Sequence, residues 1–173
     1  MQLTARPPRV MSEAPAARWG LRFWNASPSY NGHMTVVVRL PRKFLDAMIA
    51  HALEDAPVEC CGVLAAVDGA IVAVHRARNT EASPYRFNID PREYMKLEEA
   101  ITDAGATVAG FYHSHTGSEA RPSPTDIRMM GTFFGPPYIH FILGVADRDA
   151  PHARVFHIEE GSSTEHEYEV VEG

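Results

Sequence analysis

Two histidines and an aspartate occur within the stretch 113–126, which reads HSHTGSEARPSPTD. His113 and His115 follow the apolar run 107–112, so we expect them to end a strand. Alternate residues of a strand point to the same face, so both imidazoles should lie on one side and could hold one ion between them. With Asp126, they make two imidazoles and one carboxylate, the ligand set of a catalytic zinc that keeps a fourth position for water.

Asp126 must return to the histidines for this site to form. Ser123 is a good helix N-cap, Pro124 suits the first helical position, and Asp126 then falls in the first turn. Taken alone, a serine followed three residues later by an acid is typical of an ordinary helix cap. The ligand role of Asp126 therefore depends on the two histidines that precede it.

Other residues offer competing chemistry. Glu119 lies in the loop between the histidines and Ser123 and is an alternative ligand, although the sequence fixes no geometry there. Cys60 and Cys61 are the only cysteines and could suggest a thiol nucleophile, but small buried packing residues are the more usual role of such a pair. The seven histidines outside the motif show no ligand spacing.

The order His-Ser-His, seven residues, Ser-x-x-Asp resembles the signature of the JAMM (MPN-plus) metalloproteases. That family also carries an upstream glutamate in a Glu-x-Cys-Gly segment, and Glu59-Cys60-Cys61-Gly62 stands in that place here. One departure is Thr116, where many members have proline after the second histidine. The resemblance extends from about Met34 to the C-terminus.

The resemblance implies one zinc ion per chain on His113, His115 and Asp126. It implies that Glu59 acts as general base and then general acid, and that the Ser123 hydroxyl donates to the oxyanion. The implied fold is α/β, a single JAMM/MPN (cytidine-deaminase-like) domain with a curved, largely antiparallel sheet flanked by helices. No Pro-Cys-x-x-Cys follows the histidines, which argues against a nucleobase deaminase.

The compact bacterial members of the family are the most similar in length, and the segment 79–90 looks like their equivalent loop. Those members act on ubiquitin-like sulfur-carrier proteins with a Gly-Gly tail, for example releasing cysteine in cysteine biosynthesis. Three alternatives stay open: a deubiquitinase-like isopeptidase, a non-catalytic MPN scaffold, and an amidohydrolase of small molecules. Bound zinc would argue against the scaffold, and a requirement for a carrier protein would argue against the small-molecule enzyme.

The elements that must position these residues can also be read from the pattern. We expect strands at 35–40, 61–67, 70–75, 107–115, 138–145, 153–159 and 166–171. Helices should run from Pro41 to about residue 56, from Asp90 to near Gly105, and from Ser123 to about residue 132. Asp68-Gly69 predicts a type I′ hairpin turn, and 131–137 reads as a loop.

The bulk composition places these elements in one domain. The 173 residues are 45% hydrophobic and 22% charged, which is ordinary for a globular protein. A net charge of −6 gives no support for nucleic-acid binding, and no apolar run is long enough to cross a bilayer. Two adjacent cysteines offer no disulfide framework, so we expect a reducing, cytoplasmic setting.

Residues 1–33 differ in composition from the rest of the chain. They hold four arginines and one acid, a net charge of +3 against −9 for the remainder, and prolines at 7, 8, 15 and 28. We expect a disordered or loosely packed leader followed by the domain at 34–173, with Met34 as an alternative start. Trp19, Phe23 and Trp24 could instead dock on the domain.

Overall fold

The computed structural model describes residues 25–28 and 34–172. In that part of the chain the strands form one eight-stranded sheet in the order β1-β2-β8-β7-β6-β5-β3-β4. The pairs β2/β8 and β5/β6 are parallel and the other five are antiparallel, which confirms the largely antiparallel sheet. The strands are β1 Asn25–Pro28, β2 Met34–Pro41, β3 Cys61–Val67, β4 Ala70–Ala77, β5 Thr107–His115, β6 Ile139–Gly144, β7 His152–Glu159 and β8 Ser162–Val171.

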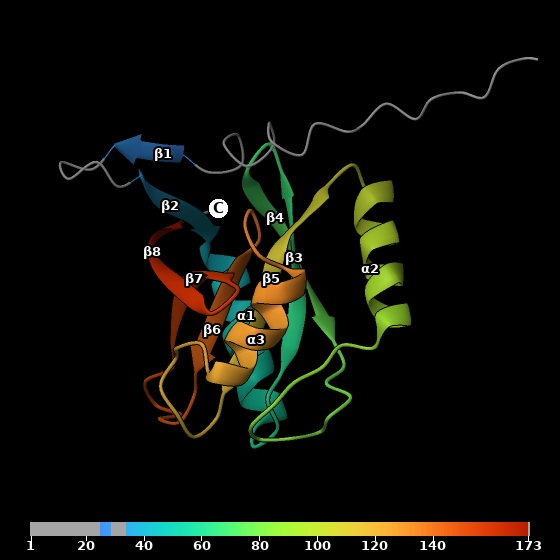
Figure 1. The fold of residues 1–173 in the computed structure, drawn as a ribbon, viewed down its shortest axis with the longest axis vertical. Helices are drawn as coiled ribbons and strands as arrows, with labels where there is room; N and C mark the ends of the chain where they lie inside the picture. The colour runs from blue at the N-terminus through green and yellow to red at the C-terminus, as the bar shows by residue number, and fades with distance from the viewer. Residues whose placement is uncertain (1–24, 29–33, 173) are drawn as a thin grey trace, which may run out of the picture.

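Three helices cover the two faces of this sheet: α1 (Arg42–Asp55), α2 (Pro91–Asp103) and α3 (Pro124–Phe133). In Figure 1, α3 lies in front of the sheet and α1 behind it. Leu45, Met48 and Ala52 of α1 belong to one buried cluster, whereas Ile101 of α2 and Met130 of α3 belong to the other. Each face of the sheet therefore has its own apolar core, which explains the apolar runs of the central strands.

The local signals in the sequence produce the elements around β5. Asp68 and Gly69 both have positive φ, 50° and 80°, as a type I′ turn between β3 and β4 requires. Asp90 caps α2 by accepting from the backbone N–H groups of residues 92 and 93. Glu93 occupies the position of a capping-box acid, but its side chain does not bond back to the backbone of Asp90. Its carboxylate accepts from the backbone N–H of Arg78 at 3.0 Å and ties α2 to the end of β4.

Several element bounds differ from the sequence prediction, two of them for a reason that the contacts show. Strand β8 begins at Ser162, four residues early, because it continues the hairpin from β7 through the paired residues Ser162 and Glu159. Helix α3 continues through Gly131 to Phe133, where the pattern suggests a loop. A Cβ at Gly131 would come within 2.4 Å of the backbone oxygen of Glu159, so this glycine permits a close approach of α3 to β7.

The N-terminal region is described only in part. Residues 25–28, which the composition assigns to the leader, form β1 and pair antiparallel with β2 at the edge of the sheet. The expectations for Trp19, Phe23 and Trp24 fall outside the described residues. In the described part of the chain, no helix has both the length and the hydropathy needed to cross a membrane.

Candidate metal centre

His113, His115 and Asp126 converge on one point, as the sequence predicts. The two histidines lie on the same face at the end of β5, and Asp126 approaches from the first turn of α3. The Nε2 atoms of the histidines are 3.2 Å apart, and they lie 3.6 Å and 3.4 Å from Asp126 Oδ2. All three residues are buried.

This spacing fits a tetrahedral metal ion. Ligands at about 2.0–2.1 Å from a tetrahedral zinc are themselves about 3.3 Å apart, close to the three measured separations. The described part of the chain holds no other such group of three or more histidine, cysteine or acidic residues. Glu119, the alternative ligand, has an exposed carboxylate that pairs with Arg121 at 3.0 Å. The donor set therefore favours Asp126 over Glu119.

Neighbouring groups fix the orientation of the two imidazoles. His115 Nδ1 donates to the backbone carbonyl of Glu119 at 2.7 Å, with Ser118 Oγ at 3.1 Å, which leaves the Nε2 lone pair free to bind a cation. The ring of His113 stacks on Phe87, with centroids 4.4 Å apart and planes 23° from parallel. Sequence reasoning missed Phe87 and the Glu119 carbonyl, because neither residue type marks a metal site.

The charge states of the three residues suit a cation. Burial lowers the pKa of His113, so its imidazole is neutral. Burial also acts to lower the pKa of His115, but Asp126, the Glu119 carbonyl and Glu59 together outweigh it and raise this pKa. Burial alone would raise the pKa of Asp126, yet the two imidazoles, 3.6 and 3.4 Å from its Oδ2, hold this pKa well below its usual range. A cation would displace any proton shared within this group.

Glu59 lies beside the triad, immediately before β3. The antiparallel register pairs Cys61 with His113, which places Glu59 level with His115 on the neighbouring strand. Its side chain is 4% exposed, and this burial raises the pKa of its carboxyl to about 7. A carboxyl with a pKa near neutrality can both take and give a proton at physiological pH, as a general base and acid must.

Ser123 caps α3, as the sequence predicts. Its Oγ accepts from the backbone N–H of Asp126 at 3.2 Å, while its own backbone N–H donates to Asp126 Oδ2 at 2.7 Å. This reciprocal capping box fixes the carboxylate that faces the histidines. The Ser123 hydroxyl accepts in the cap, so its proton stays free to donate elsewhere.

The segments around Glu59 are tied together by two side chains that the sequence did not single out for a role. The Thr116 hydroxyl, which replaces the proline of many JAMM members, lies 3.1 Å from the carbonyl of Pro57 and joins the loop after β5 to the chain before Glu59. Asn79, at the start of the segment 79–90, donates to the backbone carbonyl of Glu59 at 2.9 Å. An asparagine in a loop gives no such signal in sequence.

The thiols have the wrong surroundings for a nucleophile. Cys60 and Cys61 are completely buried and not joined in a disulfide. Burial raises the pKa of Cys60 to about 12 and raises that of Cys61 further still. The Cys61 thiol donates to the backbone carbonyl of Ala77 at 3.7 Å and lies in an apolar cluster. Both cysteines act as small packing residues, as their position suggests.

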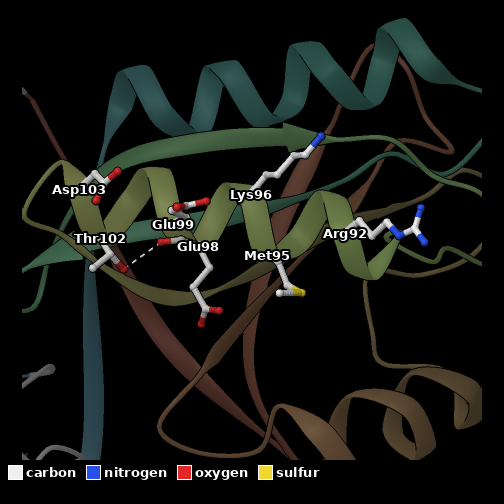
Figure 2. A pocket seen from close by; sticks show the side chains of 7 residues that line it. All are labelled: Arg92, Met95, Lys96, Glu98, Glu99, Thr102 and Asp103. Carbon is white, nitrogen blue, oxygen red and sulfur yellow. Dashed lines mark hydrogen bonds between the residues drawn. The ribbon is translucent and has the colours of Figure 1, made fainter.

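Two of the hollows formed by the described residues lie away from the triad. One of about 730 Å³ runs along the outer face of α2 and is lined by that helix alone, with Arg92, Met95 and Lys96 among its side chains (Figure 2). A smaller one of about 240 Å³ lies between α2 and α3. The larger hollow is lined by one helix and the smaller mainly by apolar side chains, and neither contains a residue of the triad.

Comparison with known proteins places the chain in a family. A model of the prokaryotic homologues of the JAB domain matches residues 41–158. A CysO-cysteine peptidase of Mycobacterium tuberculosis is 39% identical over 144 residues, which cover 80% of this chain and 94% of that one. A desampylase of Haloferax volcanii is 38% identical over 114 residues, covering 62% and 80% respectively.

A solved structure has a similar fold. The solution structure of a Desulfitobacterium hafniense protein matches with a TM-score of 0.69 at 29% identity, covering 78% of this chain and 93% of that one. The fold, the family model and the M. tuberculosis relative all agree with the resemblance carried by the histidine motif. The chain therefore belongs to the prokaryotic JAB family and is a hydrolase of the JAMM type.

Proposed function

We propose that the chain is a zinc peptidase that cleaves the amide bond after the C-terminal Gly-Gly tail of a ubiquitin-like sulfur-carrier protein, releasing an attached amino acid such as cysteine. The observation that carries the proposal is the convergence of His113, His115 and Asp126 beside the buried carboxyl of Glu59. The M. tuberculosis relative, named a CysO-cysteine peptidase and similar over nearly its whole length, supports the substrate class.

In this proposal His113, His115 and Asp126 hold one zinc ion. Zinc bound there would lower the pKa of a water molecule and polarise the scissile carbonyl. Glu59 takes a proton from the attacking water and then passes it to the leaving amine. The Ser123 hydroxyl donates to the carbonyl oxygen as that atom gains negative charge. Protein groups thus supply both proton transfer and charge stabilisation.

The loop between β4 and α2 is the proposed contact for the carrier tail. Its Phe87 packs directly on His113, so a tail that follows this loop is led to the triad. A Gly-Gly tail suits such a route, because glycines let an extended backbone pass through a narrow space. The partner is therefore a folded carrier that presents its terminal segment, in a cytoplasmic setting.

The catalytic unit in this proposal is the domain at 34–173. All five proposed site residues lie C-terminal to β2, and residues 1–33 supply none of them. A chain beginning at Met34 should bind the same amount of zinc as the full chain, measured by elemental analysis. A lower zinc content in a folded sample of that shorter chain would extend the unit into the leader.

The direct test uses a ubiquitin-like carrier extended by Gly-Gly-Cys. After incubation with the zinc-loaded chain, mass spectrometry should show that the carrier has lost the mass of one cysteine residue. Glu59→Gln is the matched control: it keeps the ligands and should be about 10²–10⁴-fold slower, the range that general acid–base catalysis supplies. An uncleaved carrier, with zinc confirmed in the sample, would refute the substrate assignment.

An isopeptidase that removes a whole carrier from another protein is a second candidate. The observation that favours it is the 38% identity to a relative named desampylase. A lysine-linked carrier conjugate offered alongside the Gly-Gly-Cys carrier separates the two activities by their relative kcat/KM. The same assay, with a free small amide as a third substrate, distinguishes a small-molecule amidohydrolase.

A further inference from the structure

Asn79 makes four hydrogen bonds with its side-chain amide, although it is not a part of the metal centre. Its Nδ2 donates to the backbone carbonyls of Glu59 and Arg86, each at 2.9 Å. Its Oδ1 accepts from the backbone N–H groups of Glu81 and Asn88, at 3.0 and 3.1 Å. The side chain is buried, and an amide has two donor protons and two acceptor lone pairs, so every one is used.

Two of these four bonds hold the backbone on either side of Phe87. Arg86, whose carbonyl accepts from Asn79, precedes Phe87, and Asn88, whose N–H donates to Asn79, follows it. Phe87 is the residue whose ring stacks on His113 at 4.4 Å. One asparagine side chain therefore fixes the backbone on both sides of the ring that packs on a proposed metal ligand.

The remaining donor bond reaches the proposed base. The backbone of Glu59 is held by the same loop twice, because its carbonyl accepts from Asn79 and its N–H donates to the carbonyl of Ser83 at 3.0 Å. On its other side, the next residue, Cys60, is bound to Ser114 of β5 through its N–H at 2.8 Å. The position of Glu59 relative to β5 thus depends on the loop as well as on the sheet.

The two ends of the loop are paired with each other at Asn79. Asn79 forms an isolated antiparallel bridge with Ile89, and the N–H of Thr80 donates to the carbonyl of Asn88 at 2.9 Å. The intervening residues 81–88 can keep their shape only while the interior of the loop is filled. The amide of Asn79 fills it and pairs with backbone groups of Glu81, Arg86 and Asn88.

We propose that Asn79 is a positioning residue that couples the loop 79–90 to the catalytic base, holding Glu59 and Phe87 in register with the two histidines. The inference rests on the proposed role of Glu59. Asn79 acts through its neighbours and does not touch the reacting atoms. Loss of its hydrogen bonds displaces Glu59 and the Phe87 ring together, so kcat falls while the proposed zinc ligands stay in place.

Asn79→Asp and Asn79→Ala test this coupling. Aspartate keeps the size of the side chain but cannot donate to the carbonyls of Glu59 and Arg86, so it isolates the two donor bonds. Asn88→Ala is the matched control. It removes one side-chain hydrogen bond of 3.0 Å within the same loop, to Thr80 Oγ1, and leaves the backbone N–H that Asn79 needs.

The first measurement needs no substrate. With zinc content confirmed as equal, hydrogen exchange at the N–H of Glu59 should speed up roughly tenfold or more in both Asn79 variants. Exchange at the N–H groups of Glu81 and Asn88 should speed up in Asn79→Ala, which also loses the acceptor oxygen, and much less in Asn79→Asp, which keeps it. The control should leave exchange at Glu59 unchanged. Wild-type exchange at Glu59 in Asn79→Ala, or equal acceleration in Asn88→Ala, would overturn the inference.

The second measurement separates this inference from the proposed function. On the Gly-Gly-Cys carrier, kcat should fall by roughly 10–100-fold in the Asn79 variants, because small displacements of catalytic groups are costly. KM should change much less than kcat. Wild-type kcat in Asn79→Asp refutes the positioning role alone, whereas an inactive wild type with altered exchange in the variants refutes the proposed function alone.

Discussion

Ser123 and Asp126 hold each other at the first turn of α3, through a bond from each backbone N–H to the other's side-chain oxygen, at 2.7 and 3.2 Å. The Asp126 oxygen that accepts from Ser123 is also the one that lies 3.4 Å from His115 Nε2. A common helix-capping device therefore aims the carboxylate. Helix start and metal centre share one local structure, so a change in either residue should have two effects.

Replacing Ser123 separates these two effects. Ser123→Ala should lower the free energy of unfolding by about 1 kcal/mol through loss of the cap, and kcat by about 10²–10³-fold through loss of a donor to the oxyanion. Ser123→Thr keeps a hydroxyl and should retain most of both. Urea unfolding and steady-state kinetics measure the two quantities, and lost stability with normal kcat would leave Ser123 as a cap only.

Asp126→Ala should release most of the zinc. Two imidazoles remain, and removing one of three protein ligands weakens such a site strongly. Elemental analysis after dialysis measures the metal content. Glu119→Ala is the control, because its exposed carboxylate pairs with Arg121 and should leave the zinc in place. If Glu119→Ala lost its zinc and Asp126→Ala kept it, Glu119 and not Asp126 would be the ligand.

Glu59 should make the metal-free protein less stable as pH rises. Burial raises the pKa of its carboxyl from 4.5 to about 7, so between these values the folded state keeps a proton that the unfolded state has lost. Stability is therefore lost as pH climbs from about 4.5 to about 7. Glu59→Gln cannot ionise and should exceed the wild type by about 1–3 kcal/mol at pH 8, with a smaller difference at pH 4.

Urea titrations of both metal-free proteins at the two pH values check this expectation. The difference between the two proteins isolates Glu59 from the other groups that titrate in the same window. A gap that is equal at pH 4 and pH 8 would show that the carboxyl is not the group responsible. Glu59→Gln, which should turn over more slowly than the wild type, is thus expected to be the more stable of the two proteins, because a buried base is costly to the fold.

Chelation and thiol alkylation should have opposite outcomes. A zinc chelator should abolish cleavage, and added zinc should restore it. Iodoacetamide at pH 8 should leave the native protein active, because Cys60 and Cys61 are buried and burial raises their pKa values. Mass spectrometry should show both thiols modified only after denaturation. Loss of activity in proportion to alkylation of the native chain would show that Cys60 or Cys61 takes part in the reaction.

Several elements could be predicted closely because both of their ends carry local signals. Strand β3 has its predicted bounds, since its apolar run ends at the Asp68-Gly69 turn. Helices α2 and α3 begin where Asp90 and Ser123 predict, because a cap acts on the adjacent turn alone. The convergence of the three proposed ligands could be predicted for the same reason, from strand alternation and one cap.

What depends on contacts distant in sequence could not be predicted. Strand order is one such feature: the parallel pairing of β5 with β6 leaves no mark on the periodicity of either strand. Gly131 is another, since a glycine that ends a helix and one that admits a neighbouring backbone look alike in sequence. Phe87 and Asn79 act through residues on other elements, so their types alone do not reveal their roles.

The place of β5 in the sheet bears on how the protein acquires its metal. This strand is hydrogen-bonded to β3 on one side and β6 on the other, and apolar clusters cover both faces of the sheet. A strand in such a setting is among the last parts of a protein to open. Both histidines are therefore prearranged in the folded chain. If they hold zinc as proposed, we expect the folded chain to capture, lose and recapture the ion without unfolding, unlike a zinc finger, whose metal creates the fold.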